Sequence, residues 1–223
     1  MTTWNRVAIL GAIAWIGAAT AQAASVQSFT SRTAFEAALG ALVVEDFDDL
    51  FADNGAITIP QNTETDLGPF SVQHSSNQSG FFAPKVVDAS GPYEVNAGSA
   101  SPYLQLRGEG DPVLTFDTPL FGFGANFNSI SDVGLTLAVH GSSFTLFDEL
   151  GPAPTSFAEP NQNGGFFGVV ATDLFSTLAF SSPRPETFAF DDVALAPVPV
   201  PAPFALLAAG LALMGGVARR RSA

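Results

Sequence analysis

Proline stands at every second position from 197 to 203, and this pattern fixes where regular structure in the chain must stop. Proline has no amide hydrogen and a fixed φ angle, so it cannot join the interior of a helix or the hydrogen-bonded ladder of a sheet. We therefore predict an extended, solvated spacer. Residues 204–218, which follow, carry no charge, and the cluster Arg219, Arg220 and Arg221 comes directly after them.

The apolar run 204–218 is predicted to form a hydrophobic helix that enters a membrane. A helix rises ~1.5 Å per residue, so this run covers roughly 22 Å, which is less than the ~30 Å hydrocarbon core of a bilayer. We therefore expect a thin or tilted transmembrane span. The arginine cluster is expected to stay in the cytoplasm and to stop transfer, which places the preceding residues outside if the N-terminus is exported.

The N-terminus has the three parts of a secretory signal peptide. Arg6 supplies a positive charge, residues 7–19 form an apolar stretch, and Ala21 and Ala23 flank Gln22 as a small-x-small cleavage site. We predict cleavage after Ala23. A retained membrane anchor is the alternative, although thirteen apolar residues are few for a span.

The order of proline motif, apolar run, arginine cluster and chain end resembles the PEP-CTERM sorting signal of Gram-negative bacteria. Residues 198–202 are similar to the Val-Pro-Leu-Pro-Ala form of that signal rather than to the Pro-Glu-Pro form. The resemblance implies processing by an exosortase-type enzyme, transient anchoring in the inner membrane by the C-terminal helix, and transfer to the cell surface or the extracellular space. A plain tail anchor is the alternative. The predicted sorting motif consists of Val198, Pro199, Val200, Pro201, Ala202 and Pro203.

Five segments are therefore expected: a signal peptide at 1–23, one folded domain at 24–196, a proline-rich spacer at 197–203, a hydrophobic helix at 204–218 and an arginine-rich tail at 219–223. All 21 Asp and Glu residues lie in the folded domain together with only four of the eight Lys and Arg residues, so its formal net charge is −17. Such a charge disfavours nucleic acid and anionic lipid, and it favours solubility and divalent cations.

The folded domain is predicted to be all-β. The chain has no cysteine, so an exported domain must be stable from its core alone, and 20 of the 21 phenylalanines precede the apolar tail. One helix is expected at residues 31–39, with Thr33 and Glu36 spaced as a capping box. Short alternating runs separated by Gly/Pro turns indicate an antiparallel β-sandwich of jelly-roll type. The predicted strands are 25–29, 42–47, 70–73, 85–88, 103–107, 113–116, 120–127, 134–140, 143–147, 166–171, 175–180 and 187–195.

Two of these runs have unusual patterns. In 121–127 the phenylalanines share one face, and Gly122, Gly124 and Asn126 share the other, which favours close packing of an overlying loop or, less so, of a flat ligand such as a sugar ring. In 186–195 the apolar positions change phase at Asp191-Asp192, which predicts a bulge or a change of sheet. The ends of the domain, at 33–49 and 188–195, resemble the opening and closing strands of many PEP-CTERM cargo domains.

Five carboxylates near these two ends are a candidate calcium site. The first and last strands of jelly-roll domains are commonly neighbours, so these side chains are expected to approach one another. Clustered carboxylates suit Ca²⁺, which takes 6 to 8 oxygen ligands, whereas capping of turns or exposure to water is the alternative. The candidate ligands of a structural Ca²⁺ are Glu45, Asp46, Asp48, Asp191 and Asp192.

Catalysis has few candidate residues. The two histidines, His74 and His140, are each expected to be an exposed loop or strand-end residue, and no nucleophile elbow, zinc-binding helix or phosphate loop is present. The favoured function is a non-catalytic component of the cell surface or of the extracellular polysaccharide matrix, in which the link to exopolysaccharide comes from the resemblance. A carbohydrate-binding module is the first alternative, with Tyr93 or Tyr103 as an exposed ring for stacking. A secreted glycoside hydrolase with paired carboxylates is the second.

Overall fold

Antiparallel β-strands make up most of the computed structural model, which describes residues 25–40, 42–50, 56–79, 82–87, 101–152 and 162–197. The strands are β1 Val26–Phe29, β2 Val43–Glu45, β3 Ile57–Thr58, β4 Thr65–Asp66, β5 Phe70–Gln73, β6 Lys85–Val87, β7 Tyr103–Arg107, β8 Val113–Ile130, β9 Thr136–Val139, β10 Ser142–Thr145, β11 Gly151–Pro152, β12 Asn163–Ser181 and β13 Thr187–Pro197. The helices are α1 Arg32–Leu39 and α2 Leu146–Glu149, and the 3₁₀ turns are η1 Asp48–Leu50 and η3 Gly108–Gly110. The all-β class predicted from the sequence is confirmed.

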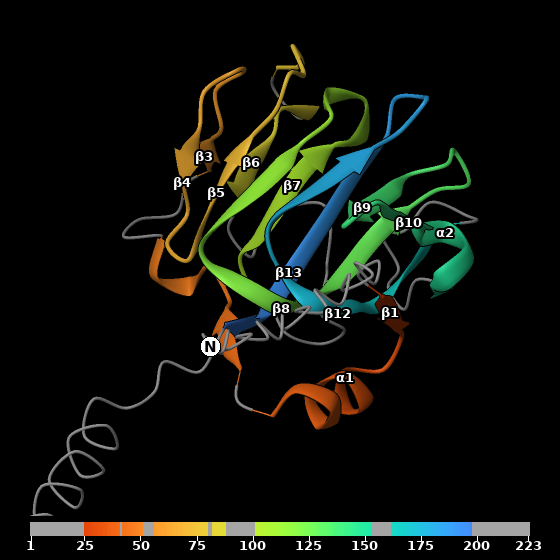
Figure 1. Cartoon of the computed structure of the whole chain (residues 1–223). Coiled ribbons are helices and arrows are strands. Elements are labelled where there is room, and N and C mark those ends of the chain that lie inside the picture. Colours follow the sequence, from red (N-terminus) through yellow and green to blue (C-terminus); the bar gives the residue numbers. More distant parts are fainter. Residues whose placement is uncertain are drawn as a thin grey trace, which may run out of the picture.

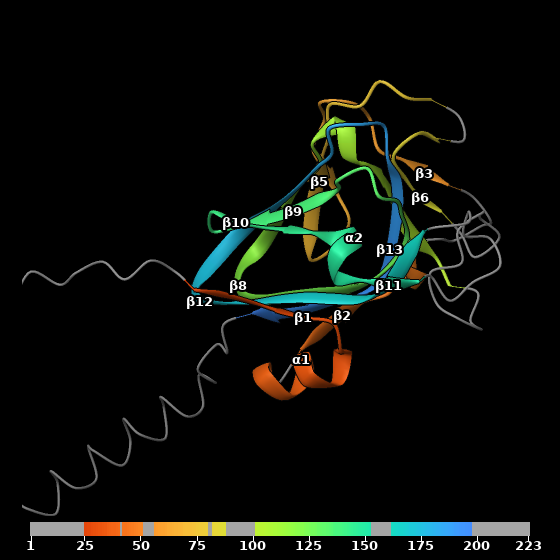
Figure 2. The same ribbon diagram turned by 90° about the vertical axis from the view of Figure 1, so that its right-hand side faces the viewer.

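One continuous 13-stranded sheet contains all of these strands, and it folds over itself through β8 and β12 (Figure 1). The two strands pair along almost their whole lengths, from Asn163 against Ile130 to Ala179 against Val113. Their register shifts between Val170 and Phe175, where both strands bend. The first part of β8 pairs with β5, and its second part pairs with β13. In Figure 2, β9 and β10 lie above the layer that contains β1 and β2.

The sequence pattern predicts two separate strands in place of β8 and two in place of β12, and this prediction is wrong. Pro119 in one strand and the polar pair Thr172 and Asp173 in the other interrupt the apolar alternation, and such interruptions usually end a strand. Here they fall at the bend, where the register shift accommodates residues that do not pair. A local break in the pattern therefore marks a corner of a continuous strand.

Phenylalanine side chains fill the space between the two parts of the folded sheet. Phe127, Phe180 and Phe190 come from three different strands and lie with ring centroids 5.4 to 6.1 Å apart. These distances are typical of aromatic pairs that contribute beyond simple burial. Phe116 extends the same cluster toward Phe175, at 6.0 Å. The predicted phenylalanine core is confirmed.

Helix α1 covers the outer face of the layer formed by β1, β12, β8 and β13 (Figure 2). Its bounds agree with the predicted helix at 31–39. The N-cap is Ser31, whose Oγ accepts a hydrogen bond from the backbone amide of Ala34, and not Thr33 of the predicted capping box. It ends at Gly40, as predicted, where a φ of 80° suits glycine. Phe35 is its one buried side chain.

The glycine face of β8 is where α1 packs. A Cβ atom on Gly124 would lie 3.2 Å from the Phe35 ring, and one on Gly122 would lie 2.5 Å from Leu39. Across the β8–β12 pair, a Cβ atom on Gly168 would lie 2.7 Å from Phe35. Close packing on this face is therefore confirmed, but a helix provides it instead of the expected loop.

No helix within the described ranges is long and apolar enough to cross a membrane. The predicted signal peptide with Ala21 and Ala23, the sorting motif at 198–203, the hydrophobic run 204–218 and the cluster at 219–221 lie outside the described residues.

Candidate functional site

The opening and closing strands are neighbours, as the calcium prediction requires. Strand β2 pairs with β13 in the register Glu45 to Val193. The predicted bulge in β13 is also confirmed, because its register against β8 shifts between Asp191 and Ala194 and Asp192 has a φ of 51°. The bulge places two consecutive carboxylates at the middle of the sheet.

Asp191 is fully buried at this bulge. Its carboxyl group accepts hydrogen bonds from Ser101 Oγ and from the amide of Asp192, both at 2.6 Å. Burial raises the pKa of Asp191 to about 7, and the negative charges of Asp192 and Asp46 also raise it, whereas the two hydrogen bonds lower it. The carboxyl of Asp191 is therefore partly protonated at neutral pH.

Asp192 has different partners. Its Oδ2 accepts a hydrogen bond from the side-chain Nδ2 of Asn126 at 2.9 Å. Arg32 on α1 lies 3.8 Å from the same oxygen and donates to the backbone carbonyl of Asp192 at 3.3 Å. This carboxylate thus links the bulge to α1, which stabilises the helix against the sheet.

Two of the three remaining candidate ligands accept hydrogen bonds from backbone amides of their own turn. Glu45 accepts from the amide of Phe47 at 2.9 Å, and Asp46 accepts from the amide of Asp48 at 3.2 Å. In the part of the chain that the structure describes, no three Asp, Glu, His or Cys side chains are arranged to hold a metal ion. The calcium site at Glu45, Asp46, Asp48, Asp191 and Asp192 stays a prediction.

A second buried carboxyl group joins the turn after β12 to η3. Glu186 accepts hydrogen bonds from the amide and hydroxyl of Ser131 at 2.8 and 2.6 Å, and its own amide donates to Glu109 at 3.1 Å. Arg107 forms an ion pair with Glu109 at 2.5 Å. Burial raises the pKa of Glu186, whereas the hydrogen bonds from Ser131 and the charge of Arg107 lower it. No local sequence pattern predicts this network, because its members come from three separate segments.

Tyr103 does not provide the exposed ring that is expected for sugar stacking, because its side chain is only 2 % exposed. The tyrosine lies on β7, which pairs with β6 and β13 and is buried on both faces, and it packs against Val87 and Ala189. Tyr93 lies outside the described residues. An exposed ring is instead present at Phe82, which is 47 % exposed and lies 5.4 Å from the Arg107 guanidinium.

A pocket of about 280 Å³ opens at the end of β5. It is lined by Asn62, Gln73, His74, Ser75, Asp111 and Val113. Its acidic residue, Asp111, accepts a hydrogen bond from Ser181 Oγ at 2.6 Å. Asn62 and Asp111 have φ angles of 55° and 44°, a conformation that Asn and Asp tolerate better than most residues.

His74 is the most buried of the lining residues, at 3 % exposure, so the expectation of an exposed loop histidine is wrong. The alternation of Phe70 and Val72 along β5 continues for one more step and places His74 on the core side. This continuation is the sequence signal that would have located the pocket. His140 is exposed at the end of β9, as predicted, with Nε2 3.0 Å from the carbonyl of Leu174.

A second pocket, of about 210 Å³, is mostly apolar. Its lining residues are Val43, Pro69, Asp117, Thr118, Leu120, Leu195 and Pro197. Each of the two pockets contains one carboxylate, Asp111 or Asp117, so neither offers the pair that the glycoside hydrolase alternative requires.

Comparison of the chain with protein-family models and with curated protein sequences finds no match.

Proposed function

We propose that this chain is an exported, non-catalytic component of the cell surface or of the extracellular polysaccharide matrix, sorted through its C-terminal segment by an exosortase-type enzyme. The observation that supports this proposal best is the position of the two ends of the folded domain. Its first and last strands, β1 and β13, leave the same layer of the sheet at the same end.

The strand register gives the separation of these ends. Val26 pairs with Ala171 of β12, the adjacent Val170 pairs with Gly122 of β8, and Gly122 pairs with Ala196 of β13. Three strand spacings of ~4.8 Å therefore separate Val26 from Ala196, or about 14 Å. A folded domain whose two ends lie so close together suits attachment to one membrane surface.

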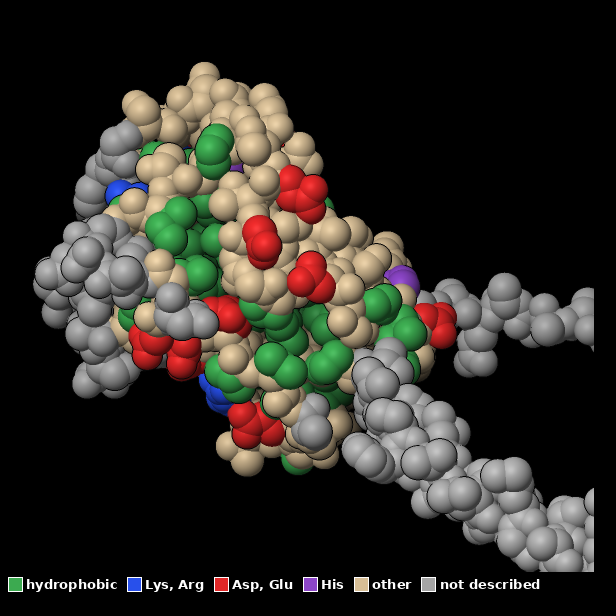
Figure 3. Space-filling view, turned by 90° about the vertical axis from the view of Figure 1, so that its left-hand side faces the viewer, with side chains coloured by type: hydrophobic (Ala, Val, Ile, Leu, Met, Phe, Trp, Pro, Cys, Tyr) green, Lys and Arg blue, Asp and Glu red, His purple; other side chains and the backbone are tan. Residues whose placement is uncertain are grey.

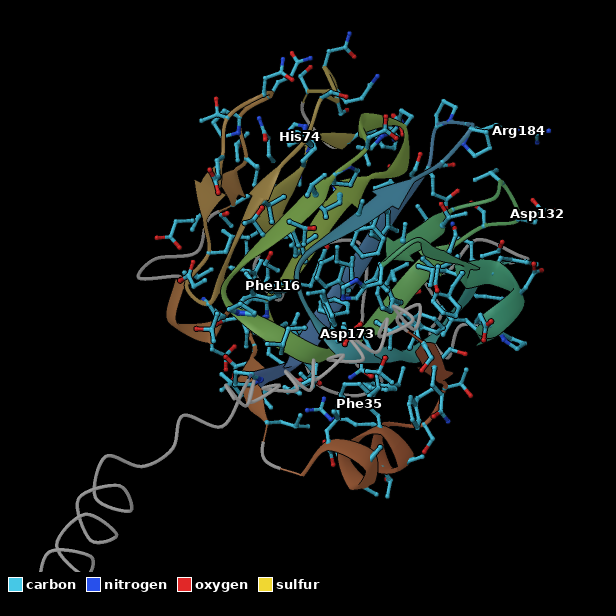
Figure 4. The ribbon with its side chains drawn as sticks, viewed as in Figure 1. Phe35, His74, Phe116, Asp132, Asp173 and Arg184 are labelled. Atoms are coloured by element: carbon cyan, nitrogen blue, oxygen red, sulfur yellow. The ribbon has the colours of Figure 1, made fainter. Side chains whose placement is uncertain are left out.

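The opposite end of the domain is then directed away from that surface. His74 lies at the end of the molecule remote from Phe35 and α1 (Figure 4). Ala196 lies near α1, because a Cβ atom on Gly122 would contact both Leu39 and Ala196. The pocket at the end of β5 would thus face outward while the chain is anchored.

The charge of the domain supports an extracellular role in an aqueous matrix. The face in Figure 3 carries several acidic side chains and few basic ones. A strongly acidic surface keeps a protein soluble and disfavours adsorption to anionic lipid. The jelly-roll-type sandwich is part of the same proposal, and the folding of the sheet through β8 and β12 supports it.

The sorting step is tested by replacing Arg219, Arg220 and Arg221 with glutamine. Because the arginines are expected to hold the tail in the membrane for processing, the triple variant should accumulate as unprocessed precursor in the membrane fraction. Immunoblotting of membrane, surface and medium fractions of the producing bacterium measures this. Arg184→Gln, in the turn before β13, serves as the control and should be processed normally. Unchanged processing of the triple variant would refute the sorting assignment.

A further inference from the structure

We propose that the outer edge of β2 and the apolar pocket beside it bind an extended peptide segment of a partner protein, in which apolar side chains stand between Lys or Arg residues. The segment would add a strand to the sheet next to β2. The proposal goes beyond the surface role above and does not depend on how the chain is sorted.

Strand β2 lies at the edge of its layer. Among the described residues it pairs only with β13, in the register Val43 to Leu195. Within this part of the chain, its other side therefore presents backbone groups that a further strand could pair with. Proteins commonly protect such an edge with charged side chains or proline, but the first two of the three residues of β2 are valines. This edge is thus suited to the addition of a strand.

The two valines of β2 are unusually exposed. Val43 and Val44 are each 48 % exposed, and they are two of the four most exposed large apolar side chains in the described part of the chain. Successive side chains of a strand point to opposite faces of the sheet, so an added strand would cover one valine on each face. Single exposed apolar residues are common on protein surfaces, whereas two of them on one strand edge indicate a contact surface.

The pocket of about 210 Å³ gives this edge a specific contact. Val43 lines it together with the buried side chains of Leu120 and Leu195. Every second side chain of an added strand would lie on the same face of the sheet as Val43, and hence beside the pocket. The volume lies well above the ~30 Å³ share of one water molecule and below the roughly 300 Å³ at which small-ligand pockets begin. One apolar side chain therefore suits the pocket better than a separate ligand.

The charges around this edge favour a basic partner. Asp117 lines the pocket, and Asp46 and Asp48, which follow β2, are exposed. Within the described ranges, no Lys or Arg forms an ion pair with any of these three carboxylates. A second copy of the domain would bring the same negative charges to the contact, whereas Lys or Arg residues at the ends of an apolar segment would complement them. A basic segment is therefore a better occupant than a second copy.

Binding of synthetic peptides to the full chain in detergent, measured by fluorescence polarisation, tests the proposal. The probe is Lys-Val-Thr-Val-Thr-Val-Lys, with blocked ends and a fluorescent label, and we expect it to bind saturably. Two control peptides should bind about tenfold more weakly or worse. In one, proline replaces the central valine, because proline cannot donate to a strand ladder. In the other, glutamate replaces both lysines.

Three variants of the chain locate the site. Val43→Asp should weaken binding of the lysine peptide about tenfold or more, because the complex would bury a charge in an apolar contact. Leu174→Asp, which alters a similarly exposed apolar side chain at the bend of β12, is the matched control and should bind as the unaltered chain does. Asp117→Lys changes an exposed position and keeps the test valid if Val43→Asp destabilises the fold. It should reduce the preference for the lysine peptide over the glutamate peptide.

The proposal is overturned if the lysine peptide does not bind, if the proline peptide binds as tightly, or if Leu174→Asp weakens binding as much as Val43→Asp does. Self-association of the unaltered chain that Val43→Asp abolishes, measured by analytical ultracentrifugation, would assign the edge to a second copy and would also overturn it. None of these measurements involves tail processing, so their failure can be told apart from failure of the proposed surface role.

Discussion

Replacement of Phe35 by alanine is expected to lower the free energy of unfolding by about 3–5 kcal/mol, the range seen when a buried phenylalanine is truncated. Phe35 is fully buried between α1 and the sheet. Its ring centroid lies 6.0 Å from that of Phe29 and 5.4 Å from that of Phe166. Because it is the one buried side chain of α1, its loss removes the main contact between the helix and the sheet.

Chemical denaturation of the full chain in detergent measures this effect. Thr33→Ala, on the exposed side of the same helix, is the control and should change the unfolding free energy by less than about 0.5 kcal/mol. A loss for Phe35→Ala no larger than that of the control would contradict the packing of α1 on the sheet.

The glycine face gives this prediction a second test. Gly168→Ala should destabilise the protein, because the new Cβ would lie 2.7 Å from the Phe35 ring. In the Phe35→Ala background the same substitution should cost clearly less, since the ring that it meets is gone. The difference between the two costs is the coupling energy of the pair. Equal costs in both backgrounds would show that the ring does not lie over Gly168.

The stability of the protein is expected to fall by about 3 kcal/mol between pH 5 and pH 8 because of Asp191. The pKa of its carboxyl group is about 7 in the folded protein, against an ordinary value of 3.8. Between these values the folded state holds more protons than the unfolded state, so the free energy of unfolding decreases as pH rises and levels off above pH 7. Over the whole interval the effect is on the order of 4 kcal/mol.

Asp191→Asn should remove most of this pH dependence, because an amide does not titrate. Unfolding free energies of both proteins at pH 5, 6, 7 and 8 measure it. Glu186, whose pKa is also raised, contributes a smaller slope of the same sign that remains in this variant. The Glu186→Gln variant, measured at the same pH values, gives the size of that second contribution. A slope that is the same with and without Asp191 would show that this carboxyl group does not titrate between pH 5 and pH 8 in the folded state.

Two patterns that are each confined to one strand were predicted correctly from the sequence. The phase change at Asp191-Asp192 is local, because apolar residues on the two sides of it must face the same core, and only a bulge allows that. The close packing on the glycine face of β8 was also predicted correctly, but the helix that packs there was not. Phe35 is remote in sequence from Gly124, and no local pattern reports a contact between such distant segments.

The polar residues were harder to place. His74 follows the last strand-forming residue of β5 and precedes a polar loop, so its sequence neighbours favour exposure although the strand alternation favours burial. Tyr103 is buried because β7 is covered on both faces, which depends on the order of strands in the sheet. The partners of Glu186, at Ser131 and Glu109, come from other turns and could be found only from the folded structure.

The position of β13 has a consequence for how such a domain is made. This strand is the last in the described chain, yet it lies in the interior of the sheet, between β8 on one side and β7 and β2 on the other. A chain that crosses a membrane from its N-terminus onward exposes unpaired edges of β7 and β8 until its final strand arrives, and such edges promote association between chains. If the chain is exported as proposed, slow delivery of residues 187–197 would therefore favour aggregation, whereas rapid delivery would close the sheet.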